Sequence, residues 1–448
     1  MKDRIYMVSL GCSKNLIDSE IMAGLIENAN LNLVNDIDDA EIIIVNTCSF
    51  INDAKEESIN TILECAMLKK EYNCKYLIVT GCLSERYKSE LMNEIPEIDA
   101  LIGTGNIDEI VEVINKLKNK QKIIRVGNIN NTFSNINNTV RVQSTPPHMA
   151  YVKIAEGCDN FCTYCIIPKL RGKFRSRAME SILEEVNYLV KNGVREIILI
   201  AQDTSKYGLD LYGEFKLPEL LDKLNDIKNL KWIRVLYIYP ETFNQKLIDS
   251  IKKNDKVLKY VDIPIQHINN HILKMMNRKA TKEEIESIIN KLRNEIPDII
   301  IRTTLIVGFP GEDKNHFEEL YQFVKKVKFD RLGVFSYSQE EDTAAASLPN
   351  QVDDSIKKQR SDKIMSLQRD ISYDLNEKKV GKIYDVIIEE KVDENLFFGR
   401  TYMDSPEIDC GVYINSKNEL EIGDFFRVKI TEFLEYDLRG ELADESSE

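Results

Sequence analysis

The sequence is organised around ten residues, 156–165, which read Glu-Gly-Cys-Asp-Asn-Phe-Cys-Thr-Tyr-Cys. Cys158, Cys162 and Cys165 follow one another at spacings of four and three residues, directly after the short apolar run 151–155. Thiolates are soft ligands that suit iron–sulfur clusters or zinc. The three thiols therefore predict a metal centre that is bound by one local loop.

The number of thiols distinguishes two kinds of metal centre. A structural zinc ion usually has four protein ligands, and the nearest additional candidate, His148, lies ten residues before Cys158 in a Pro-containing segment. Three ligands on a cubane cluster would instead leave one iron open. A zinc-binding loop stays the alternative, although thiols rarely gather in a reduced intracellular chain without a metal.

Length and composition favour a soluble protein of several domains. The chain has 448 residues, of which 43% are hydrophobic and 30% charged, and its size suggests about three domains. No apolar run approaches membrane-spanning length, and the segment before Gly11 is too short for a signal peptide, so we expect a cytoplasmic protein with no membrane contact. The net charge of −14 implies that any contact with nucleic acid is at most local.

The first part of the chain, residues 1–126, repeats one pattern three times. Apolar runs at 4–10, 42–47 and 76–81 are each followed by a cysteine, at Cys12, Cys48 and Cys82. Continuous apolar strands separated by helices predict a parallel sheet, in which the loops after the strands open on one edge. We therefore expect an N-terminal parallel α/β domain in which these three cysteines lie together. Cys65 and Cys74 fit packing or surface positions, and Cys410 has no assigned role.

A polar stretch, residues 127–148, is rich in asparagine and predicts a linker. Apolar strands then begin near residues 151, 196, 232, 260, 299 and 330, with helical patterns between them. Six βα units over residues 149–372 predict a partial (β/α)6 barrel. Its functional loops should follow the carboxyl ends of the strands, as they do in complete barrels.

Polar or glycine-rich segments stand at several of these predicted strand ends. Gln202 follows the second strand, Gln266 and His267 follow the fourth, and the run 308–311, Gly-Phe-Pro-Gly, follows the fifth. The glycine-rich run alone would also fit a tight turn, and His267 would equally fit a packing residue. A basic run follows the cluster loop and would hold a carboxylate or form a solvated surface; its members are Lys169, Arg171, Lys173, Arg175 and Arg177.

The final part of the chain changes character. An amphipathic helix is predicted over 355–379. After Gly381, short alternating strands predict a small antiparallel β-barrel, which we assign to a terminal domain of residues 373–441. Residues 373–441 contain 17 acidic and 9 basic residues, a net charge of −8. Because binding to an oligonucleotide needs a basic surface, this barrel suits a basic protein partner better.

Taken together, these motifs resemble the radical S-adenosylmethionine (SAM) methylthiotransferases over nearly the whole chain. Within that family, the runs 202–213 (Gln-Asp-Thr-Ser-Lys-Tyr-Gly-Leu-Asp-Leu-Tyr-Gly) and 237–241 (Tyr-Ile-Tyr-Pro-Glu) look like the members that modify an aspartate of ribosomal protein S-twelve. The tRNA-modifying members usually have Gly-Gln-Asn-Val-Asn at the first place. They also tend to have Pro-Arg-Pro-Gly-Thr where this chain has Gln-Glu-Glu-Asp-Thr, residues 339–343.

The resemblance implies a radical SAM barrel, a TRAM-like terminal barrel, two [4Fe-4S] clusters and SAM. The cluster on Cys158, Cys162 and Cys165 would reduce SAM to give methionine and a 5′-deoxyadenosyl radical, which abstracts hydrogen from the substrate's β-carbon. The second cluster would hold the sulfur to be inserted, on Cys12, Cys48 and Cys82. The implied SAM contacts are Tyr164, Gln202, Gln266, Val307 and Gly308. The family also needs an electron donor, whose identity the sequence does not give.

Two alternatives stay open at this point. One is the same chemistry on a tRNA adenosine, which the acidic terminal barrel disfavours. The other is a non-enzymatic module that binds zinc and RNA, which the three-thiol loop and the six-strand barrel disfavour. The acidic run 340–342 after the sixth strand is expected on the rim of the barrel, where its charge would help a basic ribosomal protein to dock.

Overall fold

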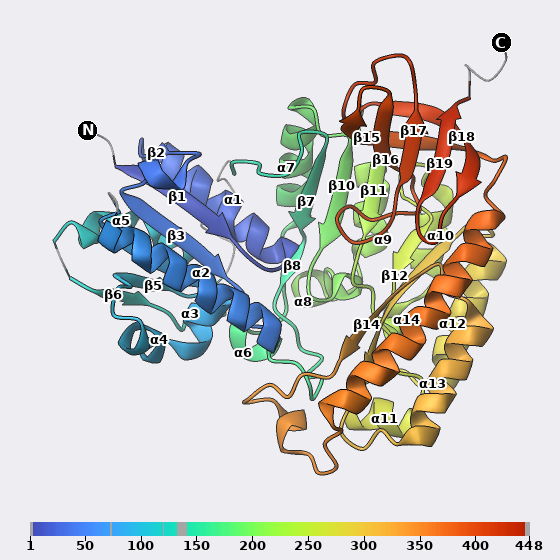
Figure 1. Ribbon diagram of the computed structural model, residues 1–448, viewed down its shortest axis with the longest axis horizontal. Helices are drawn as coiled ribbons and strands as arrows, with labels where there is room; N and C mark the ends of the chain where they lie inside the picture. Colours follow the sequence, from blue (N-terminus) through green and yellow to red (C-terminus); the bar gives the residue numbers. More distant parts are fainter. Residues whose placement is uncertain (1–2, 72–73, 120, 132–140, 444–448) are drawn as a thin grey trace.

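A parallel sheet flanked by helices forms the first part of the computed structural model, which describes residues 3–71, 74–119, 121–131 and 141–443 (Figure 1). The strand order is β2-β1-β3-β4-β5-β6, and every neighbouring pair is parallel. The elements are β1 (Arg4–Ser9), α1 (Ser13–Asn28), β2 (Asn32–Leu33), β3 (Ile42–Thr47), α2 (Asn52–Glu71), β4 (Tyr76–Gly81), α3 (Cys82–Tyr87), α4 (Ser89–Glu94), β5 (Ala100–Ile102), α5 (Ile110–Leu117) and β6 (Ile123–Arg125). The predicted parallel α/β domain is confirmed.

Strand β3 shows why this sheet forms from a continuous apolar run. Its six residues are all buried, and alternate side chains point to opposite faces. Ile42 and Ile44 pack in a core with residues of α1 and α5, whereas Ile43 and Val45 pack in a second core with residues of α2, α3 and α4. Helices on both faces thus require an apolar residue at every position in the middle of the strand.

The central part of the chain is a partial barrel of six parallel strands. They form two hydrogen-bonded groups, β7-β10-β11 and β12-β13-β14, and a bridge between Ile233 and Val257 links the two. The strands are β7 (Met149–Lys153), β10 (Glu196–Ile200), β11 (Trp232–Val235), β12 (Tyr260–Asp262), β13 (Ile300–Val307) and β14 (Arg331–Ser336), with a short antiparallel pair of β8 (Ala155–Glu156) and β9 (Arg175–Ser176). This confirms the predicted six-unit barrel. Part of the predicted linker, residues 132–140, lies outside the described residues.

Helices fill the connections between the barrel strands. They are α6 (Ile167–Arg171), α7 (Met179–Lys191), α8 (Leu209–Tyr212), α9 (Leu217–Asn225), α10 (Gln245–Lys253), α11 (Asn270–Met275), α12 (Lys282–Glu295), α13 (Lys314–Val327) and α14 (Asp354–Glu377). The last helix packs Ile364 and Ile371 into the barrel core. The proposed domain boundary at residue 372 therefore lies inside α14.

The terminal part is a closed five-stranded barrel with the order β15-β16-β17-β19-β18. Its strands are β15 (Ile383–Asp393), β16 (Leu396–Arg400), β17 (Val412–Asn415), β18 (Phe425–Phe433) and β19 (Leu438–Leu442). Most pairs are antiparallel as predicted, but β17 and β19 pair in parallel and so close the barrel. The barrel rests on the amino ends of the central strands, where Arg400 pairs with Glu196 at 2.6 Å and Asp404 pairs with Arg331.

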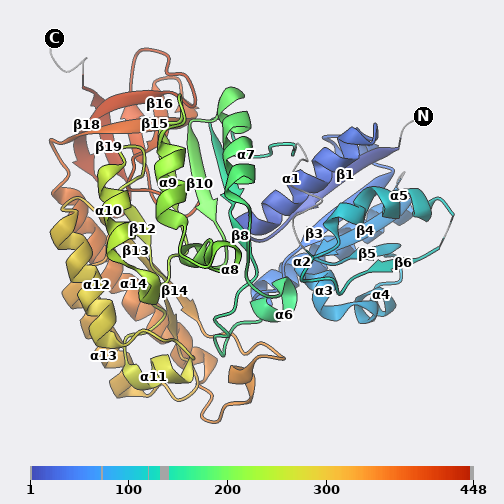
Figure 2. The same cartoon turned by 180° about the vertical axis from the view of Figure 1, so that it is seen from behind.

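Helix α1 lies between the N-terminal sheet and strands β7 and β8 in both views (Figures 1 and 2). Because it packs on two sides, its polar residues Asp18 and Glu20 are buried along with Ile17 and Ile21. The two α/β parts thereby meet through polar as well as apolar side chains. Among the described residues, no helix is long and apolar enough to cross a membrane.

Candidate cluster and cofactor site

Three cysteines of the N-terminal domain stand at the carboxyl ends of adjacent strands. Cys12 follows β1 as the residue before α1, Cys48 follows β3, and Cys82 follows β4 as the first residue of α3. The loops approach closely, since a methyl group added at Gly11, whose φ is +86°, would lie 2.6 Å from Cys48 Cβ. The structure thus brings together the three strand-end cysteines that the sequence singled out.

Asn15 connects these cysteine loops to one another. Its Nδ2 donates to the carbonyl oxygens of Leu10 at 3.1 Å and of Thr47 at 2.8 Å, and its Oδ1 accepts from Cys82 Sγ at 3.8 Å. Because Leu10 and Thr47 each precede one of the cysteine loops, a single buried amide holds them in register. The sequence analysis gave Asn15 no role.

Burial keeps the thiols of Cys82 and Cys48 protonated in the free protein. It raises the pKa of Cys82 to about 12, partly offset by Arg171, while the negative charges that Cys48 and Cys12 would carry raise it further. Burial likewise raises the pKa of Cys48. Thiols packed together in this way become stable thiolates only when a cation such as iron compensates their charge. The donor set therefore fits a metal cluster.

The cluster loop itself occupies the connection between β8 and α6. Gly157 has a φ of +79°, and a Cβ there would lie 2.1 Å from the carbonyl oxygen of Lys173, so only glycine fits. Hydrogen bonds from Cys158 N to Gly172 O at 3.1 Å and from Cys165 N to Cys162 O at 3.0 Å fold the loop back on itself. Burial raises the pKa of Cys158 to about 11 and that of Cys165 still higher.

Neither thiol set is arranged for a single ion. Within the part of the chain that the structure describes, no group of three or more His, Cys, Asp or Glu side chains is placed to hold one metal ion. A four-iron cubane spaces its thiolate ligands more widely than one ion does, so both thiol sets stay compatible with a cluster. His148, the additional ligand considered for zinc, lies 3.2 Å from Glu389 of the terminal barrel.

Two glutamines at strand ends carry buried oxygen atoms that have no hydrogen-bond partner among the residues that the structure describes. Gln202, after β10, donates from Nε2 to Glu156 Oε1 at 2.6 Å, and its own Oε1 is free. Gln266 has a φ of +68°, which is unfavourable for a residue with a side chain, and its Oε1 is also free. Buried acceptors rarely stay unpaired in a complete structure, so both oxygens point to an additional group at this site.

The glycine-rich turn after β13 is built for close packing. Val307 is fully buried, and Gly308 has a φ of +71°, with its N–H donating to Glu312 Oε1 at 3.0 Å. Tyr164 of the cluster loop packs against a small cluster that includes Phe309 and Tyr337. Burial raises the pKa of the Tyr164 hydroxyl, and the adjacent Cys162 raises it further, so that the hydroxyl stays protonated.

Arg278 and Glu241 are two site residues that the sequence analysis did not identify. Arg278 donates from Nη2 to Pro264 O at 2.8 Å and stacks 4.2 Å over the Tyr239 ring. Its buried Nη1 has no hydrogen-bond partner within the described part of the chain. The buried Oε2 of Glu241 also lacks one. Burial lowers the pKa of Arg278, whereas the negative charges that Tyr164, Cys162 and Glu241 would carry raise it above its usual value, which places the pair beside the cluster loop. Glu241 belongs to the quoted run 237–241, whereas nothing in the sequence marked Arg278.

His267 and the acidic run differ in how they are used. His267 is fully buried, accepts from Asn269 N at 3.0 Å and lies 3.4 Å from Glu312, which matches the packing alternative. The expectation that Glu340 lies on an open rim is wrong. Glu340 is 2% exposed and pairs with Lys55 at 2.8 Å and Arg86 at 2.9 Å. These cations belong to α2 and α3, so Glu340 joins the N-terminal domain to the central barrel.

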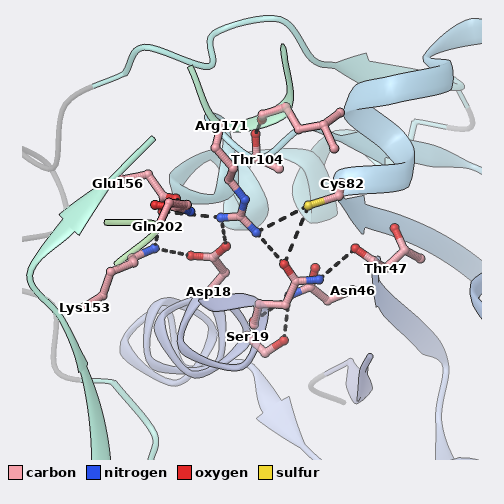
Figure 3. A network of polar contacts seen from close by, with 12 residues as sticks. Asp18, Ser19, Asn46, Thr47, Cys82, Thr104, Lys153, Glu156, Arg171 and Gln202 are labelled. Carbon is pink, nitrogen blue, oxygen red and sulfur yellow. Dashed lines mark hydrogen bonds and ion pairs between the residues drawn. The ribbon is translucent and has the colours of Figure 1, made fainter. Parts of the chain in front are cut away.

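The basic run after the cluster loop divides into surface and buried members. Lys169 is 60% exposed, whereas Arg171 is 3% exposed. Arg171 lies in a network of polar contacts between the N-terminal domain and the barrel, in which its guanidinium points toward both Asp18 and Cys82 (Figure 3). Neither alternative considered from the sequence, a cofactor carboxylate or a solvated surface, describes Arg171.

Comparison with known proteins shows close relatives over the whole length. The ribosomal protein uS12 methylthiotransferase RimO of Clostridioides difficile is 53% identical over 439 residues, 98% of each chain. The protein of the same name from Desulforamulus reducens is 52% identical over 442 residues, 98% of this chain and 99% of the relative. This chain belongs to the RimO family. The resemblance found in the sequence is thereby confirmed.

Three family models match successive parts of this RimO-family chain. They are uncharacterized protein family UPF0004 at residues 4–103, the radical SAM superfamily at 152–324 and the TRAM domain at 380–443. The first two matches imply SAM and iron–sulfur clusters as cofactors. The third agrees with the closed terminal barrel.

Solved structures share the fold at low sequence identity. The radical SAM methyltransferase TsrM of Kitasatospora setae matches with a TM-score of 0.56 and 12% identity, over 74% of this chain and 73% of TsrM. The cobalamin-dependent SAM radical enzyme OxsB matches with a TM-score of 0.52 and 13% identity, over 83% of this chain and 56% of OxsB. At these identities the likeness concerns the fold alone.

Proposed function

We propose that this chain is a radical SAM methylthiotransferase that adds a methylthio group to the β-carbon of an aspartate in ribosomal protein uS12. The observation that carries the proposal is 53% identity over 98% of the chain to a relative named as a uS12 methylthiotransferase. The two sets of three cysteines support it independently of that name. Because its proposed substrate is a ribosomal protein, we infer that the enzyme works in the cytoplasm.

We assign the first [4Fe-4S] cluster to Cys158, Cys162 and Cys165 and the second to Cys12, Cys48 and Cys82. Each set belongs to loops at the carboxyl ends of parallel strands, where ligands of α/β proteins usually bind. In each case three thiols would leave one iron without a protein ligand. Asn15 in the second set and the Gly157 turn in the first would hold the cysteine loops in place.

The unpaired polar atoms of the barrel fit SAM. Arg278 Nη1 is a buried donor that would bind the carboxylate of SAM, and Glu241 Oε2 is a buried acceptor that would bind its amino group. Gln202 and Gln266 offer free amide oxygens to further donors of the same molecule. Together with these residues, we propose contacts from the cluster loop and the β13 turn, namely Tyr164, Val307 and Gly308.

When bound, the clusters and SAM supply the electron transfer, the radical and the methylthio group, so that the protein's own contribution is to position and shield them. Four of the six assigned cysteines are buried, with Cys82 and Cys158 both 6% exposed, whereas Cys12 is exposed, so the protein shields each site in part. Tyr164 keeps its proton and therefore introduces no further negative charge beside the cluster loop.

Anaerobically reconstituted protein, supplied with SAM, sulfide and a chemical reductant, tests this function. We expect mass spectrometry to show uS12 carrying one methylthio group in place of hydrogen, on an aspartate. Replacing that aspartate by alanine in uS12 is the matched control and should abolish the product. A brown protein with charge-transfer absorption is also expected, since zinc would give a colourless one.

Two outcomes would contradict the proposal in different ways. Methylthiolation of tRNA adenosine, with uS12 unmodified, would replace the substrate while the cofactors stand. Colourless protein that binds zinc and cleaves no SAM would remove the enzyme function altogether.

A further inference from the structure

Four charged side chains form a buried ionic network between the two α/β parts of the molecule (Figure 3). Lys153 Nζ lies 2.6 Å from both Asp18 Oδ1 and Glu156 Oε2, and Arg171 Nη1 lies 2.5 Å from Asp18 Oδ2. Each of the four is at most 8% exposed. The two cations and two carboxylates have no net charge together. Such pairing is what makes the burial of four charged groups energetically possible.

Arg171 also contacts residues outside this group of four charges. Its Nη2 donates to Asn15 Oδ1 and lies 3.6 Å from Cys82 Sγ, so its second edge faces the N-terminal cysteines. The guanidinium is planar and has donors on two edges, and therefore binds the carboxylate of Asp18 and the sulfur of Cys82 at the same time. A lysine would offer one point charge at this place.

The network continues to the SAM side of the barrel. Glu156 Oε2 lies 3.4 Å from Arg171 Nη1, and its other oxygen accepts from Gln202 Nε2 at 2.6 Å. One unbroken chain of polar contacts thus runs from Cys82 through Arg171 and Glu156 to Gln202. The residues involved come from α3, α6, β8 and the loop after β10, and the chain crosses the domain boundary.

We propose that Arg171 is a positioning residue that raises the reduction potential of the N-terminal cluster by donating to the Cys82 sulfur, and that it holds this cluster against the SAM-binding side of the barrel. This inference rests on the proposed function, because it requires a cluster on Cys12, Cys48 and Cys82. Reduction adds negative charge to a cluster. A cation and an N–H donor at a ligand sulfur stabilise the reduced form, and burial strengthens that effect.

The test isolates the N-terminal cluster. In a protein with Cys158, Cys162 and Cys165 all changed to Ala, only that cluster remains, and its midpoint potential is measured by a redox titration followed by electron paramagnetic resonance. We expect a more negative potential in Arg171→Met and a smaller shift in Arg171→Lys, which restores the charge without the second edge.

Arg177→Met is the matched control. Arg177 belongs to the same basic run and pairs with Glu185 at 2.6 Å, but it donates to Lys153 O and Ser181 and not to a cysteine. We expect the midpoint potential of the N-terminal cluster in Arg177→Met to equal that in the parent protein. If Arg171 served folding alone, Arg171→Met and Arg171→Lys would lower the stability of the protein and leave the potential of the cluster equal to that of the parent.

Arg171→Met alone leaves the network with one cation and two carboxylates. The double variant Arg171→Met with Asp18→Asn removes one cation and one carboxylate together and so keeps the charges balanced. Full iron content with an unchanged potential in these variants would overturn the inference. Loss of iron from all of them, with Arg177→Met intact, would also overturn it, since Arg171 would then serve folding only. A parent triple variant without iron would instead contradict the second cluster of the proposed function, and the inference with it.

Discussion

Lys379 follows α14 and carries its ammonium group into the junction between the central and terminal barrels, where it is 9% exposed. Burial, followed by the charge of Arg331, lowers the pKa of Lys379 from 10.5 to about 8. An unfolded lysine keeps its proton to a higher pH. Between pH 8 and 10.5 the unfolded chain therefore binds more protons, and the free energy of unfolding rises with pH.

We expect wild-type protein to gain about 2 kcal/mol of unfolding free energy relative to Lys379→Met between pH 8 and pH 10. Urea denaturation of both proteins at the two pH values measures this change. Lys378→Met, at the exposed neighbouring position, is the matched control. If the difference between wild type and Lys379→Met stays constant over this range, Lys379 is charged in the folded protein and the prediction is wrong.

Glu340 is another single residue on which a contact between domains depends. Changing Glu340 to Gln leaves Lys55 and Arg86 without their shared carboxylate, so we expect a loss of about 3 kcal/mol in the free energy of unfolding. Glu341→Gln is the control at the next residue. Its side chain is 57% exposed, and its loss should cost about 1 kcal/mol or less.

Urea denaturation measures the free energy of unfolding of Glu340→Gln and Glu341→Gln. Equal losses in the two variants would show that the buried ion pairs of Glu340 stabilise the protein no more than the exposed contacts of Glu341 do. Because Glu340 pairs with Lys55 and Arg86, Glu340→Lys would weaken the contact between the domains, so it would not report on the docking of a basic substrate.

At the scale of one element, the cluster loop between β8 and α6 is compact enough to be altered as a unit. We expect the variant with Cys158, Cys162 and Cys165 changed to Ala to lose about half of its iron and all cleavage of SAM. Iron analysis and chromatography of 5′-deoxyadenosine measure the two quantities. Persistent cleavage of SAM in this variant would rule out the assigned ligands.

Cys65→Ala is the control for that experiment because Cys65 lies on α2 and points into the apolar core of the N-terminal domain, 2% exposed. Its loss should cost about 1 kcal/mol in the free energy of unfolding, as for a small core truncation, and leave the iron content unchanged.

At the scale of the whole molecule, the two thiol sets belong to different domains, and their roles should separate. We expect Cys48→Ala to form 5′-deoxyadenosine from SAM but to give no methylthiolated uS12. The reason is that the radical requires the barrel cluster alone, whereas insertion of sulfur requires the N-terminal one. Product analysis by mass spectrometry decides, and equal loss of both activities in folded protein would speak against separate clusters.

The distribution of charge over the whole molecule also differs from what the composition suggests. The terminal barrel has a net charge of −8, yet several of its carboxylates bind arginines instead of facing solvent. Asp404 pairs with Arg331, and Asp409 lies 3.4 Å from Arg302, both on central barrel strands. These contacts dock the terminal barrel, so its charge count overstates what is available to a basic partner.

The sequence by itself determined the architecture and the two thiol sets of this protein. Apolar runs with the spacing of strands and helices predicted the parallel sheet and the six-unit barrel, because secondary structure and burial follow from periodicity within a short segment. The cysteines were found for the same reason. Three stand within eight residues, and the other three each follow a strand of a parallel sheet, whose ends must lie together.

Only the tertiary structure decided which charged residues are buried and which residues of opposite charge they contact. Asp18 lies on a helix whose apolar spacing predicts one buried face, but α1 packs between two domains and buries its polar side as well. Its partner Arg171 is 153 residues away in the sequence, and Arg86 and Glu340 are 254 residues apart. A charge enters the interior only when another part of the chain supplies the opposite charge, and no local pattern contains that information.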